Sequence, residues 1–138
     1  MRDALRQAGR QPAEVGLAVV YSTGDHRTET AVRAALEAEF DADLRVCDVT
    51  RTTGRTGGAD GTLAVAVAVE AIRRGVLPRE GSIPPLAGRS GQGASNWAPP
   101  AGRLALCLGV DRSGSSIAVL LGGPGPMEDH VNGREGRA

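Results

Sequence analysis

The sequence predicts an α/β fold with a mixed sheet, for three reasons. In the first 75 residues, apolar runs of strand length alternate with segments of helical spacing, which is the pattern of parallel strands joined by helices. Two further apolar runs, 103–110 and 115–121, follow each other across a short polar turn, as in a C-terminal antiparallel hairpin. Alanine and glycine outnumber the large apolar residues, so we expect helices packed on the sheet over a thin core.

The first elements follow in the order helix, strand, helix, strand. Residues 2–9 have the spacing of a short helix, and residues 14–21 form a continuous apolar run. Such a run is typical of a central strand that is covered on both faces. Turn residues 22–25 precede a second helical pattern, over 28–40, and residues 44–49 alternate as a second strand.

The segment 62–75 fits two structures by its local pattern. Its three valines favour a strand, whereas its length, its alanine content and its Arg-Arg-Gly ending favour a buried helix, and we interpret it as a helix. Residues 79–102 are rich in proline, glycine and serine and predict a long loop. Residues 1–121 would then form one domain, followed by a flexible tail at 122–138.

The charge balance argues against several classes of partner. All 16 basic residues are arginines, scattered among 16 acidic ones, and the formal net charge is zero. No clustered positive charge is available for nucleic acid. No apolar run approaches the ~18 residues of a membrane span, and the charged first 20 residues lack the apolar core of a signal peptide. We therefore expect a cytoplasmic protein with neither nucleic acid nor membrane as a partner.

Metal and cofactor signals are weak throughout the chain. Cys47 and Cys107 lie in apolar runs, the usual setting of buried thiols in a reducing compartment. Together with His26 and His130 they lack the spacing of a zinc site. The glycine-rich segment 52–61 lacks the spacing of a dinucleotide fingerprint. The sequence thus predicts no metal and no cofactor.

The turn after the first strand, from Tyr21 to Glu29, is the first candidate site, because strand ends of this kind commonly line sites in α/β sheets. His26 could act there as an acid or base, or be an exposed residue in the first turn of a helix. The glycine-rich loop 52–61 is the second candidate. Its glycines could bring backbone amides close to a ligand, or let the next helix pack tightly.

Three segments together carry a resemblance to a known family. They are Val19-Val-Tyr-Ser-Thr-Gly-Asp25 with the downstream Glu29, Gly54-Arg-Thr-Gly-Gly-Ala-Asp-Gly61 with a helix ending Gly75-Val-Leu-Pro78, and the hairpin from Leu106 to Leu121. In this order they resemble the C-terminal part of the β-ketoacyl synthases, condensing enzymes with the thiolase fold. The resemblance implies a truncated thiolase-like half, with motif positions at Thr23, Gly24, Asp25, Glu29, Gly54, Arg55, Gly58 and Gly61.

The chain departs from the family at the catalytic positions. In that family, condensation needs a cysteine nucleophile and two histidines. The cysteine belongs to the N-terminal half of the family's proteins. Tyr21 occupies the place of the first histidine and Arg55 that of the second. A guanidinium remains protonated and cannot shuttle a proton. It could hold an anion, or form a structural salt bridge to a residue such as Asp60. Tyr21 could form a hydrogen bond or pack in the core.

The pair Gly54-Arg55 at the second motif resembles the sequence of the chain-length factor at this position. The chain-length factor is the noncatalytic partner of polyketide ketosynthases. The resemblance therefore implies a noncatalytic subunit that associates with a ketosynthase or with the missing N-terminal half, and with an acyl carrier protein as a further candidate partner. Two alternatives remain open. The chain could be half of a split acyl-transfer enzyme to which His26 or Tyr21 contributes, or a small acyl-ligand binding module.

Overall fold

The chain folds as a mixed α/β protein, which confirms the predicted class. The structure is a computed structural model that describes residues 1–41, 44–75, 104–111 and 113–123. The loop predicted at 79–102 and His130 lie outside the described residues, as does the predicted tail except for Gly122 and Gly123. In the part of the chain that the structure describes, no helix is both long and apolar enough to cross a membrane.

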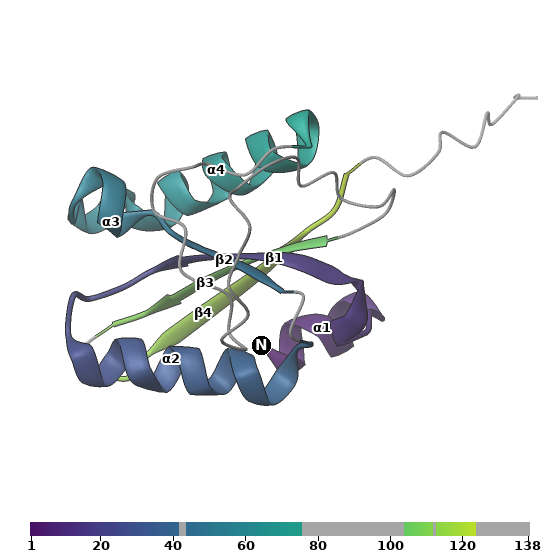
Figure 1. Cartoon of the computed structure of the whole chain (residues 1–138), viewed down its shortest axis with the longest axis horizontal. Coiled ribbons are helices and arrows are strands. Elements are labelled where there is room, and N and C mark those ends of the chain that lie inside the picture. The colour runs from purple at the N-terminus through teal and green to yellow at the C-terminus, as the bar shows by residue number, and fades with distance from the viewer. Residues whose placement is uncertain (42–43, 76–103, 112, 124–138) are drawn as a thin grey trace, which may run out of the picture.

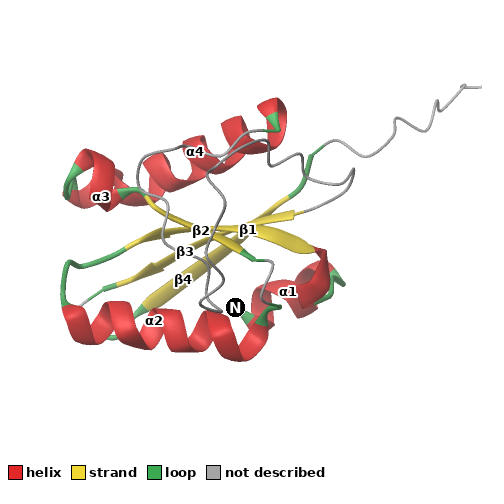
Figure 2. Cartoon of the chain, in the orientation of Figure 1, coloured by secondary structure: helices red, strands yellow, loops and turns green. Residues whose placement is uncertain are grey.

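Helices and strands alternate up to β2, after which two helices and then two strands follow (Figure 2). Two short 3₁₀ turns lie at 12–14 and 57–59. The elements are α1 (Arg2–Ala8), β1 (Val15–Tyr21), α2 (His26–Glu39), β2 (Arg45–Asp48), α3 (Thr50–Thr53), α4 (Asp60–Arg74), β3 (Leu104–Val110) and β4 (Ser116–Leu121). The ambiguous segment 62–75 is helical as predicted: residues 62–74 lie within α4, and Gly75 follows its last residue. The short helix α3 was not predicted, because the sequence there is dominated by threonine and glycine.

The four strands form one sheet in the order β2-β1-β3-β4. The central strand β1 is parallel to both of its neighbours, and β4 is antiparallel to β3. Residues 15–20 are buried without interruption. A continuous apolar run is what a strand with both faces covered requires, and the prediction of a central strand is therefore confirmed.

Helices cover both faces of the sheet, with α1 and α2 on one and α3 and α4 on the other (Figure 1). Side chains alternate along β1, so that Ala18 and Val20 join the cluster under α1 and α2. Leu17 and Val19 join the cluster under α4, together with Cys47 and Cys107. Both cysteines are buried free thiols, as their apolar surroundings predicted.

Local capping sets where the helices begin and end. Asp25 caps α2 by accepting bonds from the backbone nitrogens of Arg27 (3.4 Å) and Thr28 (3.3 Å). This cap explains why α2 begins at His26, two residues before the first position of the apolar pattern. Gly75 adopts a left-handed conformation, with φ +65°, and ends α4.

Candidate functional site

The connections after β1 and β2 leave the sheet in opposite directions. The chain passes from β1 to α2 on one face, and from β2 to α3 and α4 on the other (Figure 1). Where neighbouring parallel strands diverge in this way, a crevice opens at their carboxyl ends, and α/β proteins commonly bind ligands there. The candidate site of this chain lies at that place.

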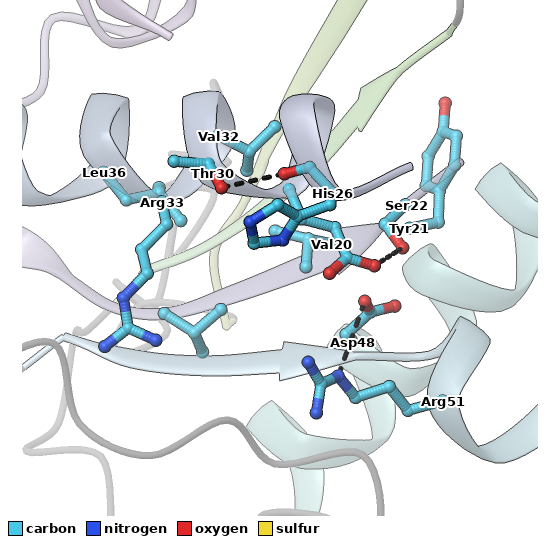
Figure 3. A pocket seen from close by; sticks show the side chains of 12 residues that line it. Val20, Tyr21, Ser22, His26, Thr30, Val32, Arg33, Leu36, Asp48 and Arg51 are labelled. Atoms are coloured by element: carbon cyan, nitrogen blue, oxygen red, sulfur yellow. Dashed lines mark hydrogen bonds and ion pairs between the residues drawn. The ribbon is translucent and has the colours of Figure 1, made fainter. Parts of the chain in front are cut away.

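A cavity of about 290 Å³ occupies this crevice on the α2 side (Figure 3). Its apolar lining comes from strands and helix alike: Val20, Val32, Leu36 and Val46. Its polar lining surrounds the strand ends: Ser22, His26, Glu29, Thr30, Arg33, Asp48 and Arg51, with Tyr21 at the edge. Cavities near 300 Å³ are at the lower end of the usual range for small-molecule sites.

Two carboxylates at the crevice each accept a hydrogen bond from a hydroxyl group, and the two hydroxyls lie side by side. Ser22 Oγ donates to Glu29 Oε1 (3.2 Å) and lies 3.2 Å from Thr50 Oγ1. Asp48 Oδ1 accepts from the backbone nitrogen of Thr50 (2.9 Å) and from its hydroxyl (2.6 Å). The bond to the Thr50 backbone also starts α3. Asp48 itself is only 2% exposed, so this network holds a buried charge at the strand end.

Three basic side chains complete the lining. Arg33 pairs with Glu37 at 3.0 Å, and Arg51 Nε lies 4.0 Å from Asp48 Oδ2. His26 is exposed in the first turn of α2, as one of the two interpretations of the sequence expected. Its imidazole turns toward the space between the lining side chains (Figure 3).

The ring of Tyr21 points away from the other lining side chains (Figure 3) and packs with the cluster under α4. It lies over its strand partner Gly109, where an added Cβ would be 1.7 Å from Tyr21 Cζ. Burial raises the pKa of the phenol, and the charges of Asp60 and Asp111 add to the effect. A tyrosine held protonated at neutral pH serves here as packing over a glycine.

The two sequence motifs meet at the carboxyl end of β1. Arg55 Nη1 donates to the carbonyl oxygen of Thr23 (3.2 Å), and an added Cβ on Gly61 would lie 3.8 Å from the Tyr21 ring. Asp60 accepts from the hydroxyl (2.6 Å) and the backbone nitrogen (2.8 Å) of Thr56. These bonds, with the charge of Arg55, lower the pKa of Asp60.

The remaining motif positions have backbone roles. Gly54 ends α3 with φ +68°, a conformation that side chains rarely adopt. Gly24 has φ +71° in the turn before α2, and Thr23 is buried beside it. Gly58, in the second 3₁₀ turn, has open space at its Cα. These positions shape the two loops and add no side chain to the cavity.

The sequence located part of the cavity but not all of it. His26 and Glu29 belong to a segment that was selected because it follows a central strand, whereas Asp48, Arg33 and Arg51 were missed. A signal for Asp48 existed, since the end of β2 must lie beside the end of β1 in a parallel pair. Arg33 and Arg51 had no such signal, because arginines at helical spacing are typical of any exposed helix face.

The two cysteines lie outside the cavity, in the cluster under α4. Burial raises the pKa of the Cys47 thiol to about 11, with a further contribution from Asp48, and burial alone raises that of Cys107 to about 11. Both thiols therefore lack thiolate character at neutral pH. Among the described residues, no three histidine, cysteine or acidic side chains gather as metal ligands.

No protein-family model and no curated protein matches the chain.

Proposed function

We propose that this chain is a noncatalytic, ketosynthase-like subunit of the chain-length-factor type, acting in a polyketide or fatty-acid complex through association with a ketosynthase or with a ketosynthase N-terminal half. The observation that carries the proposal is the meeting of the two motif segments. Arg55 contacts Thr23, and Gly61 lies beside Tyr21. Thr23 and Arg55 are 32 positions apart in the sequence. Their segments thus converge at one strand end, as motifs that share a site must.

The chemistry at these two positions supports a noncatalytic role. Tyr21 packs over Gly109 with a raised pKa, and Arg55 is bonded to a backbone carbonyl. Neither group can exchange a proton near neutral pH. The split-enzyme alternative would draw on Tyr21 or on His26, and these two side chains turn to different sides of β1. The alternative needs only one of them, and His26 is the one whose ring faces the cavity (Figure 3).

Exposed apolar side chains on β4 support association with a partner. Ile117 is 57% exposed and Val119 is 37% exposed, and both lie on the sheet face that carries Cys107 and α4. Helix α4 packs on β1 and β3, which leaves this end of the face uncovered by α4. A ketosynthase subunit that covers β4 would remove this apolar surface from water.

Affinity purification of the tagged protein from the cells that produce it tests the proposal. We expect mass spectrometry to identify a ketosynthase, or a ketosynthase N-terminal half, in stoichiometric amount. The double variant Ile117→Ser, Val119→Ser is the matched control and should lose that partner while remaining folded. Recovery of the wild-type chain alone, as a monodisperse monomer at micromolar concentration, would contradict the proposal.

The cavity beside α2 favours a second candidate function, a small-ligand binding module. Its volume of about 290 Å³ and its mixture of apolar floor and charged rim are the usual features of small-molecule sites. This candidate is compatible with the first, because the cavity lies on the α2 side of the sheet and the exposed residues of β4 face the α4 side.

A further inference from the structure

The cavity beside α2 has an apolar floor and, at one end, a carboxylate whose charge is not balanced. From this arrangement we infer that it binds a short, branched aliphatic monoamine, with its ammonium group at Glu29 and its hydrocarbon body on the floor. The inference rests on the small-ligand candidate function, which it makes specific, and is independent of any ketosynthase partner. Its three supports are the pairing of the charges, the acceptors near Glu29 and the apolar lining.

The charges that line the cavity are paired, except for that of Glu29. Arg33 Nε is bonded to Glu37 at 3.0 Å, and Arg51 Nε lies 4.0 Å from Asp48 Oδ2. Within the described residues, Glu29 has no basic side chain at ion-pair distance. Because each ion pair cancels, the cavity retains the single negative charge of Glu29. A cationic ligand is attracted to this charge, and an anionic one is repelled.

Two further acceptors accompany Glu29 in the lining. The Ser22 hydroxyl donates its proton to Glu29 Oε1 (3.2 Å) and keeps its lone pairs. His26 precedes Glu29 by three residues on α2, so both lie on one side of the helix. Its imidazole turns toward the cavity (Figure 3) and in its neutral form offers one acceptor nitrogen. An ammonium group carries three donors, which these three side chains can satisfy.

The far end of the cavity limits the ligand to one charge. The Ser22 hydroxyl, and with it Glu29, lies at one end of the lining, and the Arg33 guanidinium lies at the other (Figure 3). A diamine would place its second ammonium group toward this guanidinium and be repelled. The guanidinium already has Glu37 as its carboxylate, so the far end of the ligand needs no charge of its own.

The floor between the two ends fits a branched hydrocarbon. It is formed by Val20 and Val46 from the strands and by Val32 and Leu36 from α2. Apolar contacts of this kind favour a hydrocarbon body over a polar one. A volume of about 290 Å³ accommodates a small ligand and is low for a larger cofactor.

Four probes test this inference on the unaltered protein. The 3-methylbutyl group is shared by 3-methylbutylamine, which is cationic, 3-methylbutan-1-ol, which is neutral, and 4-methylpentanoate, which is anionic. Methylamine carries the charge without the branched body. In titrations followed by calorimetry and by NMR, we expect 3-methylbutylamine to bind about tenfold or more tightly than each of the others, since each lacks either the charge-assisted bond or the apolar contact.

The outcomes separate this inference from the candidate function on which it rests. Equal or tighter binding of the alcohol or of the carboxylate would overturn the inference and leave a small-ligand site in place. Equal binding of methylamine would overturn the role of the floor. Absence of binding by all four probes at millimolar concentration would overturn the small-ligand function as well. None of these results bears on the partner experiment on β4.

The substitution Glu29→Gln locates the ammonium group. It removes the charge and retains an acceptor for the Ser22 hydroxyl, so it should weaken the binding of 3-methylbutylamine about tenfold and leave that of the alcohol unchanged. Glu70→Gln removes the same charge from α4, outside the cavity lining, and is the matched control that should bind the amine as the wild type does. Equal losses in the two variants, or an equal loss of amine and alcohol in Glu29→Gln, would contradict the assignment of Glu29.

Discussion

The two faces of the sheet are built from side chains of different size. Under α4 the buried residues are mostly small, with three alanines on the helix and Ala105 and Cys107 on β3. Under α1 and α2 they are large: Leu36 on α2 and Phe40 just after it share a cluster with Leu106 and Leu108 on β3. The same strands thus support a close helix on one face and a more distant one on the other.

This difference explains why the cavity lies beside α2. Small side chains allow a helix backbone to approach the sheet closely, and the Tyr21 ring fills the space over Gly109 at the strand ends on that face. Large side chains hold α2 further from the sheet, and beyond the last of them a cavity remains at the carboxyl ends of β1 and β2. The cavity is therefore a consequence of side-chain volume as well as of topology.

The largest expected effect is on the face with large side chains. Leu106 is fully buried in the cluster under α1 and α2, and Leu106→Ala should lower the free energy of unfolding by about 2–5 kcal/mol, through lost burial and the space left behind. Urea unfolding followed by circular dichroism measures it. The neighbouring Cys107→Ala, on the other face, should cost less because it removes a single atom. The reverse ranking would contradict the comparison of the two faces.

The face with small side chains should respond to added volume. Ala68 is fully buried where α4 packs on the sheet. Ala68→Leu should therefore lower the free energy of unfolding by about 1–3 kcal/mol through overpacking. Ala66→Leu, at an exposed position of the same helix, should change it by no more than about 0.5 kcal/mol. Equal effects in thermal unfolding would show that α4 does not approach the sheet as closely as described.

A smaller effect is expected where Tyr21 covers Gly109. Gly109→Ala places a Cβ against the ring and should displace it. In a double-mutant cycle with Tyr21→Ala, we expect a coupling free energy of about 1 kcal/mol, with Gly109→Ala costing less once the ring is absent. Additive effects would mean that the ring does not lie over the glycine in solution.

The smallest effect on stability at neutral pH is expected from the two buried thiols. Burial raises the pKa of Cys47 and of Cys107 from 9.0 to about 11. The folded state thus holds these protons more tightly than the unfolded state. The resulting stability is fully present below pH 9 and is lost as the pH rises through about 11. The melting temperature should fall across this interval, and should do so less in the Cys47→Ala variant.

Alkylation measures the same burial at lower pH. At pH 8 a thiol with a pKa of about 11 is ionised about a hundredfold less than one at 9, so iodoacetamide should react about a hundredfold more slowly with the folded protein. Rapid reaction of either cysteine in the folded protein would show that the face under α4 is open.

The fold was predictable because its strands carry strong local patterns. The continuous run of β1 indicated a strand covered on both faces, and the Arg-Arg-Gly ending indicated that residues 62–75 are helical. The site was only partly predictable. His26 and Glu29 follow the central strand directly in sequence, whereas Arg33 on α2 and Arg51 on α3 reach the cavity because the fold brings these two helices to the same strand ends. Such placements depend on packing between distant segments, which spacing in one sequence does not encode.

The proposal that the chain supports a complex without taking part in its chemistry is tested most directly by product formation in a complex reconstituted with the proposed ketosynthase partner. The informative variants are Tyr21→Phe and Arg55→Gln, at the positions where the resemblance expects histidines. We predict complexes of unchanged stoichiometry whose rates stay within about twofold of the wild type, since neither group exchanges a proton near neutral pH. A loss of a hundredfold or more, about the contribution of a general acid or base, in a complex that still assembles would contradict the claim.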